Sequence, residues 1–282
     1  MITVLSLFGS VQAAEFSIYD IQYTEDPNGD SPQNGLIVDC TGGIVTHKSP
    51  SGRPRLIVQD PAYPDGWGAI QVKDLFGTGV FDDVNVGDWI SLTNVLVEEY
   101  KASTFLQYME ENDAGFTVVS TNNPLPKPLI VTVDQIAAPI EGFDIWAISD
   151  YSAEKYEAML VKVVNVNVKD TGYGKAFDNY VLASNADPNL ICWVSDYMNA
   201  GKEKGLIYHP SVKIGKNFCG VTGILEQYTG DQDGIYYDYY QLLTRSIEDF
   251  TIEQIADLDG DCDVDFVDFG IFTEHWLEGK RE

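Results

Sequence analysis

Gly87-Asp-Trp-Ile-Ser-Leu-Thr-Asn-Val-Leu-Val-Glu-Glu-Tyr100 and Gly215-Lys-Asn-Phe-Cys-Gly-Val-Thr-Gly-Ile-Leu-Glu-Gln-Tyr228 are two versions of one segment, 128 residues apart. Glycine, glutamate and tyrosine coincide at the first, twelfth and fourteenth positions, and several apolar residues also match. A period of this length is too long for a solenoid repeat and indicates two copies of one domain. A chain of 282 residues has room for two domains of ordinary size.

The rest of each half supports this division with a common series of β-branched and apolar runs. The matching runs are 36–46 with 158–168, 56–59 with 180–182, 69–72 with 191–194, the repeated segment, and 104–108 with 239–243. Gly42-Gly43 interrupts the first run, as expected of a bulge or a sharp bend. Five strands with a long first strand predict an OB-fold, which is a small Greek-key barrel. A pair of β-sandwiches fits the strand count nearly as well, because counting strands does not fix their pairing.

A family resemblance favours the barrels. The residues that carry it are Val58-Gln-Asp-Pro61, Trp67-Gly-Ala-Ile-Gln-Val72, Val86-Gly-Asp88, Glu99-Tyr100 and Phe105-Leu-Gln107. They resemble OB-fold modules of exported bacterial proteins, some of which lie beside secreted nucleases, and the similarity covers most of residues 16–120. The second half shares the repeated segment only. We therefore expect a mainly β protein with two tandem OB-fold-like five-stranded barrels, at 15–122 and 129–248, joined by a proline-rich linker at 123–128.

Composition and the N-terminus indicate an exported, acidic protein. The formal net charge is −27, which opposes binding to phosphates, so we expect nucleic acid to be disfavoured as a partner. Residues 1–14 resemble a secretory signal peptide without its basic region, and a first β-strand is the alternative. No stretch reaches the ~18 apolar residues of a membrane span. Of four cysteines (Cys40, Cys192, Cys219 and Cys262), Cys192 and Cys219 share a half and are candidates for a disulfide, although unpaired thiols fit as well.

The strongest chemical signal is the segment Asp257-Leu-Asp-Gly-Asp-Cys-Asp-Val-Asp-Phe-Val-Asp268. An EF-hand loop takes oxygen ligands from positions 1, 3, 5, 7, 9 and 12. Those positions are occupied by Asp257, Asp259, Asp261, Asp263, Asp265 and Asp268. Phe269, Phe272 and Trp276 follow at helical spacing, so the pattern predicts a Ca²⁺ loop and a helix within 251–282. The alternative is an accidental acidic run, such as the one at Asp26-Pro-Asn-Gly-Asp30.

Residues 256–277 resemble one half of a type I dockerin, the module that attaches secreted enzymes and adhesins to cohesin-bearing scaffolds. The alternating aspartates and the Phe266-Val-Asp-Phe269 entry into the helix carry this resemblance. Two features depart from the family pattern. Dockerins normally have two such loops, whereas this chain shows one, and Cys262 stands where a glycine usually makes the turn.

No motif compels an enzyme. The three histidines form no catalytic constellation, and neither a GxSxG elbow nor a phosphate-binding glycine loop is present. Aromatic residues are the candidates for a sugar- or base-stacking face, although alternating aromatics are more often cross-strand pairs. They are Tyr63 and Trp67 between two strands of the first half, and Tyr236, Tyr237, Tyr239 and Tyr240 near the end of the second.

These observations lead to two expectations. The first is a secreted, extracellular or cell-surface, non-catalytic calcium-binding protein, whose barrels contact a glycan or protein partner and whose dockerin-like tail attaches to a cohesin-like or cell-surface protein. The second is an accessory or divergent enzyme of extracellular polysaccharide degradation, or less favourably of nucleic-acid degradation. The charge argues against nucleic acid, and the missing catalytic constellation argues against an enzyme.

Overall fold

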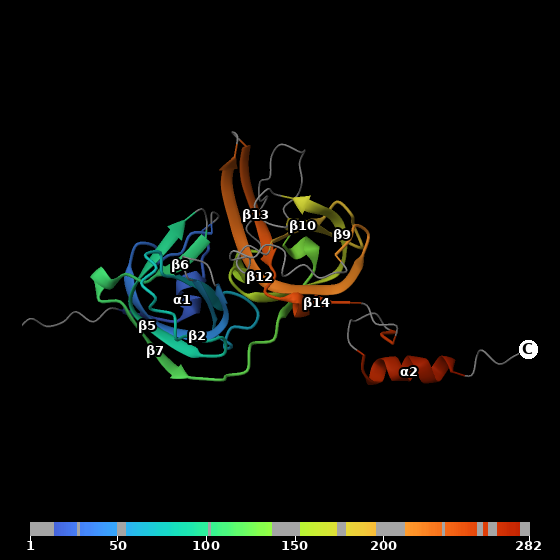
Figure 1. Ribbon diagram of the computed structural model, residues 1–282, viewed down its shortest axis with the longest axis horizontal. Coiled ribbons are helices and arrows are strands. Elements are labelled where there is room, and N and C mark those ends of the chain that lie inside the picture. Colours follow the sequence, from blue (N-terminus) through green and yellow to red (C-terminus); the bar gives the residue numbers. More distant parts are fainter. Residues whose placement is uncertain are drawn as a thin grey trace, which may run out of the picture.

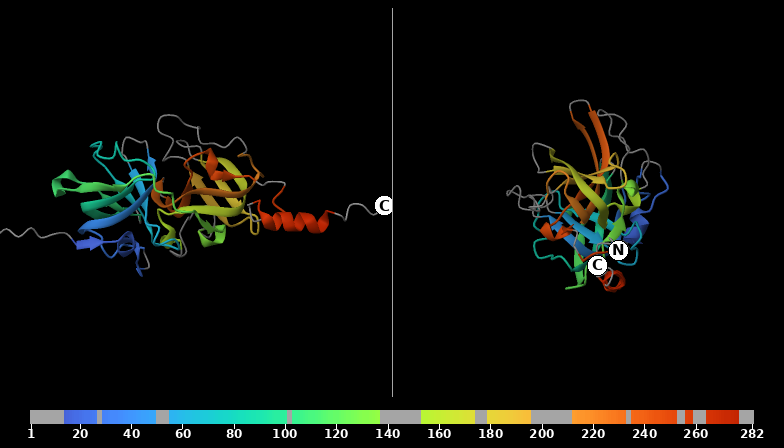
Figure 2. Two further views of the ribbon diagram at one scale, coloured as in Figure 1. Left: turned by 90° about the horizontal axis from the view of Figure 1, so that it is seen from below. Right: turned by 90° about the vertical axis from the view of Figure 1, so that its right-hand side faces the viewer.

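The computed structural model confirms a mainly β protein with two closed five-stranded barrels. It describes residues 14–26, 29–49, 55–100, 103–136, 153–173, 179–195, 212–232, 235–252, 256–258 and 264–276. The barrels lie side by side, and a helix near the C-terminus lies beyond the second barrel, away from the first (Figures 1 and 2). Residues 1–13 lie outside the described residues, so export stays a prediction.

The first barrel is built from five strands that close on themselves. They are β2 (Ile37–Ser49), β3 (Arg55–Gln59), β4 (Ala69–Lys73), β5 (Trp89–Tyr100) and β6 (Ser103–Gln107). Their order is β2-β3-β4-β6-β5, and pairing of β5 with β2 closes the ring. The outer strands are β1 (Ala14–Phe16) and β7 (Gly115–Ser120), and the short helices are α1 (Ile18–Gln22) and η1 (Glu110–Asn112).

The second barrel repeats this plan. Its five strands are β9 (Leu160–Tyr173), β10 (Asn179–Ser184), β11 (Ile191–Ser195), β12 (Asn217–Gln232) and β13 (Ile235–Leu243), and β12 closes the ring on β9. In both barrels the third and fifth strands pair in parallel. The additional elements are β8 (Leu129–Val131), β14 (Phe250–Thr251), η2 (Val133–Gln135), η3 (Glu154–Tyr156), η4 (Ile247–Asp249) and α2 (Phe266–His275).

Glycines explain how the long strands bend and begin. Gly42 has φ +73°, and a Cβ atom there would lie 1.7 Å from the carbonyl oxygen of Ile90, so only glycine lets β2 approach β5 this closely. The β2–β5 register shifts at this point, as the Gly42-Gly43 pair predicts. The first glycines of the repeated segments, Gly87 and Gly215, both have positive φ just before β5 and β12.

Each barrel has its own apolar interior. Leu56, Ile70, Val72 and Leu106 are completely buried in the first barrel together with Ile18 of α1. The second barrel buries a similar set that includes Leu182, Val194, Val221, Ile224 and Leu242. Complete burial of an aliphatic side chain contributes roughly 1.5–3 kcal/mol, so each interior is a large source of stability for its barrel.

Of the described cysteines, some are free thiols and one is in a disulfide. Cys40 and Cys192 are free and buried, and burial raises the pKa of each thiol to about 12. Cys219 is disulfide-bonded, so the expected alternative of a bridge between Cys192 and Cys219 is wrong. Among the described residues, no helix is long and apolar enough to cross a membrane.

Candidate functional site

The outer face of β3, β4 and β6 in the first barrel is where an OB-fold usually binds its ligand. Side chains alternate along these strands: Leu56 and Val58 point into the barrel, whereas Ile57 and Gln59 point outward. Nevertheless Ile57 is completely buried, and it belongs to the apolar cluster of the second barrel, not of the first. The second barrel therefore covers this face of the first.

Hydrogen bonds fix the two barrels in this arrangement. The amide of Leu160 donates to Oε1 of Gln59 at 3.1 Å, and the amide of Thr104 donates to Oε2 of Glu157 at 3.2 Å. The amide of Trp67 donates to the carbonyl of Lys155 at 2.6 Å. These bonds place the start of β9 and the η3 turn against the β3–β4–β6 face.

Charged side chains are buried at the same interface. Burial, together with the neighbouring carboxylate of Glu99, raises the pKa of Glu157 to about 8. Burial also raises the pKa of Glu99 and lowers the pKa of Lys73 to about 8. The Lys73 ammonium lies 3.4 Å from the centroid of the Phe105 ring, a cation–π contact that offsets part of its desolvation.

The equivalent face of the second barrel has a different composition. Val181, Ala183, Ile191 and Trp193 occupy the outward positions of β10 and β11, and they form a cluster separate from the interior of the barrel. The first three are almost inaccessible, whereas Trp193 is half-buried. Its ring lies 5.6 Å from that of the half-buried Tyr239 on β13, at an interplanar angle of 40°. This aromatic pair is the part of the face that reaches solvent.

The aromatic pair adjoins the interface between the barrels. Trp193 is opposite Gln241 in the β11–β13 ladder, and Nε2 of Gln241 donates to Oε2 of Glu226 at 2.8 Å. The other oxygen of Glu226 lies 3.4 Å from Nη1 of Arg55, which belongs to the first barrel. A ligand at Trp193 would therefore lie close to a guanidinium supplied by the other barrel.

The β12–β13 hairpin extends from the second barrel beside this face (Figure 1). Two of the predicted ligand residues, Tyr236 and Tyr237, belong to its second strand, where they are opposite Asp231 and Gly230. In an OB-fold the loop between the fourth and fifth strands flanks the ligand, so the hairpin has the place that ligand contact requires.

Two further predicted ligand residues, Tyr63 and Trp67, lie in an aromatic cluster on the first barrel. Tyr19 of α1 stacks on Tyr63 at 4.7 Å and on Tyr23 at 5.2 Å, and Tyr23 meets Trp67 edge-on at 5.7 Å. Sequence reasoning paired Tyr63 with Trp67 but missed Tyr19 and Tyr23, because these precede the barrel and carry no strand pattern.

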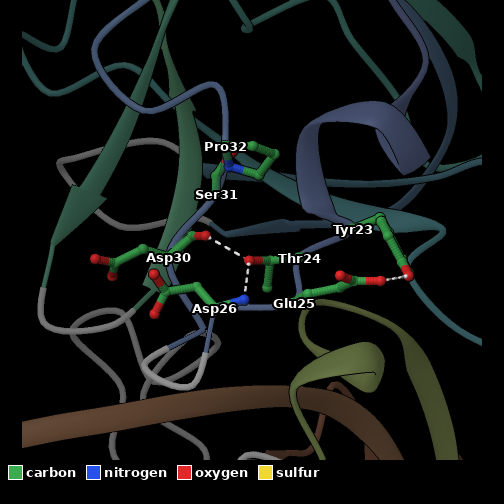
Figure 3. A pocket seen from close by; sticks show the side chains of 7 residues that line it. All are labelled: Tyr23, Thr24, Glu25, Asp26, Asp30, Ser31 and Pro32. Carbon is green, nitrogen blue, oxygen red and sulfur yellow. Dashed lines mark hydrogen bonds between the residues drawn. The ribbon is translucent and has the colours of Figure 1, made fainter.

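An open cavity of about 590 Å³ begins at Tyr23 (Figure 3). It is lined by Tyr23, Thr24, Glu25, Asp26, Asp30, Ser31 and Pro32. The Tyr23 hydroxyl donates to Oε1 of Glu25 at 3.0 Å, and this bond raises the pKa of the phenol. With three carboxylates in its lining, the cavity is a poor place for a phosphate.

The predicted calcium loop is only partly within the described residues. Asp259, Asp261 and Asp263 lie outside them. Asp265 is the N-cap of α2, and the buried Asp268 accepts hydrogen bonds from the amides of Asp265 and Leu258, at 2.7 and 2.5 Å. The expected helix is present, but Phe269, Phe272 and Trp276 are exposed rather than packed against a barrel. Calcium binding stays a prediction.

Comparison with known proteins finds similarity among solved structures alone. No protein family matches the sequence, and no curated protein matches it. Among solved structures, fission yeast Pot1 with single-stranded DNA is similar at 12% identity and a TM-score of 0.34, over 93% of both chains. The HINa domain of Ifi202 with double-stranded DNA has 11% identity and a TM-score of 0.34, over 75% of this chain and 98% of that one. Replication protein A bound to single-stranded DNA has 12% identity and a TM-score of 0.28, over 90% and 55%. Both barrels resemble OB-folds.

These similarities correct our expectations about function and partners. We expected nucleic acid to be disfavoured, and we expected a secreted calcium- and glycan-binding protein with a cohesin-like partner, or else a polymer-degrading enzyme. The three structures named above are instead complexes with DNA. The physical reason for the error is that net charge sums over the whole chain, whereas base stacking depends on a local face.

Proposed function

We propose that this protein binds a single-stranded oligonucleotide on the outer face of the second barrel. The observation that carries the proposal is the half-buried pair formed by Trp193 and Tyr239. Every nucleobase has a π-face, and OB-folds bind single strands by stacking successive bases on aromatic side chains along this face. Arg55, whose Nη1 is 3.4 Å from Oε1 of Glu226 at the edge of the face, is a candidate for a phosphate contact.

The distribution of charge favours the second barrel as the binding domain. Residues 129–248 contain 9 basic and 16 acidic residues, whereas residues 1–128 contain 6 and 17 and residues 249–282 contain 2 and 11. The second barrel is thus the least acidic part of the chain relative to its length. The first barrel has a hidden ligand face and an acidic cavity, which leaves the second barrel as the better site for a nucleic acid.

The proposal is tested by fluorescence anisotropy with a labelled oligothymidylate of about 12 nucleotides, a length within the range that one OB-fold occupies. Stacking is worth about 1–3 kcal/mol per base, so Trp193→Ala should weaken binding by roughly 5- to 150-fold. Trp276→Ala is the matched control, because Trp276 is 65% exposed on α2, beyond the second barrel. If Trp193→Ala and Trp276→Ala bind the oligothymidylate with equal affinity, the assignment of the site to Trp193 is wrong.

The salt dependence distinguishes stacking from phosphate neutralisation. Binding that relies on lysine and arginine contacts weakens steeply with salt, because neutralised phosphates release counterions. Here the net charge of −27 repels the strand, and added salt screens that repulsion. We therefore expect affinity to stay level or to rise between 50 and 200 mM salt. A steep fall would show that the contact is electrostatic and that the Trp193 face is not its main determinant.

A further inference from the structure

The contact between the barrels hides a second surface of the type that OB-folds use for binding. The outward side chains of β3 and β4 are Ile57, Gln59, Ala69, Gln71 and Lys73, and none is more than 7% exposed. They occupy the positions that Val181, Ala183, Ile191, Trp193 and Ser195 have in the second barrel. One copy of the repeated fold thus uses this face for a contact within the molecule.

Ionisable side chains are buried in this contact, so the stability of the docked arrangement depends on their protonation. Glu157 is 2% exposed, one of its oxygens accepts the Thr104 amide, and a hydrogen bond with the Ser103 side chain lowers its pKa without cancelling the effect of burial. Glu99 faces it from β5, and its Oε2 has no hydrogen-bond partner in the part of the chain that the structure describes. Two neighbouring carboxyl groups in a dry contact cannot both be ionised without cost.

The charges around Glu157 come from several strands of both barrels. Lys73 faces it from β4, and Lys73 in turn interacts with Arg55 on β3 and with Glu226 on β12 of the second barrel. Glu98, next to Glu99 on β5, also acts on Lys73. The cluster therefore has two cations against four carboxylates, and protonation of one carboxylate lowers this excess of negative charge.

We propose that the docked arrangement is an autoinhibited state, in which the second barrel covers the ligand face of the first and ionisation of Glu157 favours release. Undocking would expose the Ile57–Lys73 face as a second binding surface next to Trp193. The covalent connection between the barrels, through residues 121–128, keeps them together when the contact opens. This device concerns the arrangement of the barrels and does not depend on what Trp193 binds.

The direction of the pH effect follows from linkage. The docked state raises the pKa of Glu157 from its ordinary 4.5 to about 8, so docking is strongest below pH 4.5 and weakens up to pH 8. The docked state lowers the pKa of Lys73 from 10.5 to about 8, so docking strengthens again between pH 8 and 10.5. The population of docked molecules should pass through a minimum near pH 8, with a change of up to about tenfold per pH unit on each side.

Hydrogen exchange on the full chain reads this equilibrium directly. The amides of Thr104 and Leu160 donate across the contact, whereas the amide of Val163 pairs within the second barrel and corrects for the intrinsic pH dependence of exchange. Relative to Val163, we expect Thr104 and Leu160 to lose protection from pH 5 to pH 8. Small-angle scattering should show a larger radius of gyration over the same range.

Two variants separate the contributions of Glu157 and Lys73 to the pH dependence of docking. Glu157→Gln keeps an acceptor oxygen for Thr104 and removes the titrating proton, so it should abolish the change below pH 8. Lys73→Met should abolish the strengthening of docking above pH 8 and should keep the weakening of docking between pH 5 and pH 8. Glu110→Gln, at an exposed position on η1, is the matched control and should behave as the wild type. If Glu157→Gln does not fold, the wild type and Lys73→Met still give the curve.

Either of two results overturns the proposal. One is an exchange ratio and a radius of gyration that stay constant from pH 5 to pH 9.5 in the wild type. The other is a Glu157→Gln variant that responds to pH as the wild type does. Neither measurement includes nucleic acid, so failure of the device and failure of the proposed function are distinguishable.

Discussion

Ile57→Ala should uncouple the two barrels while leaving both folded. Ile57 is completely buried and points away from the interior of its own barrel into the apolar cluster of the second. Truncation of a completely buried isoleucine costs about 2–5 kcal/mol, from lost burial and from the cavity that remains. Since the lost contacts belong to the interface, this cost should fall on docking and not on the stability of the first barrel.

The neighbouring residue supplies the matched control. Leu56 is also completely buried, on the same strand, but its side chain points into the first barrel. Leu56→Ala removes a similar volume and should destabilise the first barrel itself. Native-state hydrogen exchange compares the two variants, with the Leu160 amide reporting on docking and the Val72 amide on the first barrel.

In Ile57→Ala, the Leu160 amide should exchange at least about 30-fold faster than in the wild type, which corresponds to 2 kcal/mol. The Val72 amide should keep its protection. In Leu56→Ala, protection of Val72 should fall by a similar factor. The reasoning is refuted if Ile57→Ala weakens Val72 as much as Leu56→Ala does, or if Leu160 exchanges at the wild-type rate.

Two further predictions concern the barrel closure and the tail. Gly42→Ala should prevent the β2–β5 approach, because the added Cβ would lie 1.7 Å from the Ile90 carbonyl oxygen at a φ of +73°. Loss of cooperative thermal unfolding of the first barrel, with Gly35→Ala as a control at an open site that also has positive φ, would confirm this; equal melting of the two variants would contradict it. For the tail, the sequence predicts heat of Ca²⁺ binding in titration calorimetry that Asp259→Ala with Asp261→Ala abolishes. If the wild type gives no heat of binding at millimolar Ca²⁺, the prediction of a calcium loop is wrong.

The sequence predicted the fold of each barrel well, because the residues that determine it lie within one half of the chain. The repeated glycines at Gly87 and Gly215 mark the start of equivalent strands, and the glycines in β2 mark its bend. Strand length and β-branched composition gave the five runs of each half. These features depend on backbone geometry and on the packing inside one barrel. Both can be inferred from the pattern of residues along the chain.

The docking of the barrels could not be predicted in the same way. All five residues of β4 from Ala69 to Lys73 are buried, yet Gln71 and Lys73 would be expected on a solvent face from their polarity. Their burial depends on partners such as Glu157 that lie far away in the sequence. Of the candidate site, Tyr239 was among the predicted aromatic residues, whereas Trp193 was missed for a related reason. Trp193 alternates with the interior residues Cys192 and Val194, and its outward position can be interpreted only once the barrel face is known.

Comparison of equivalent positions shows how the outer faces of the two barrels differ. Gln59 and Gln71 of the first barrel correspond to Ala183 and Trp193 of the second. A face that docks against strand-end amides needs side-chain acceptors, and Gln59 supplies one to Leu160. A face that stacks planar rings needs aromatic and apolar side chains, and the second barrel supplies them at the same positions. A Gln71→Trp substitution would therefore bring a ring into the dry contact beside Lys73, and we infer that the polar residues of the first barrel hold the pair in register while the second barrel is left to bind.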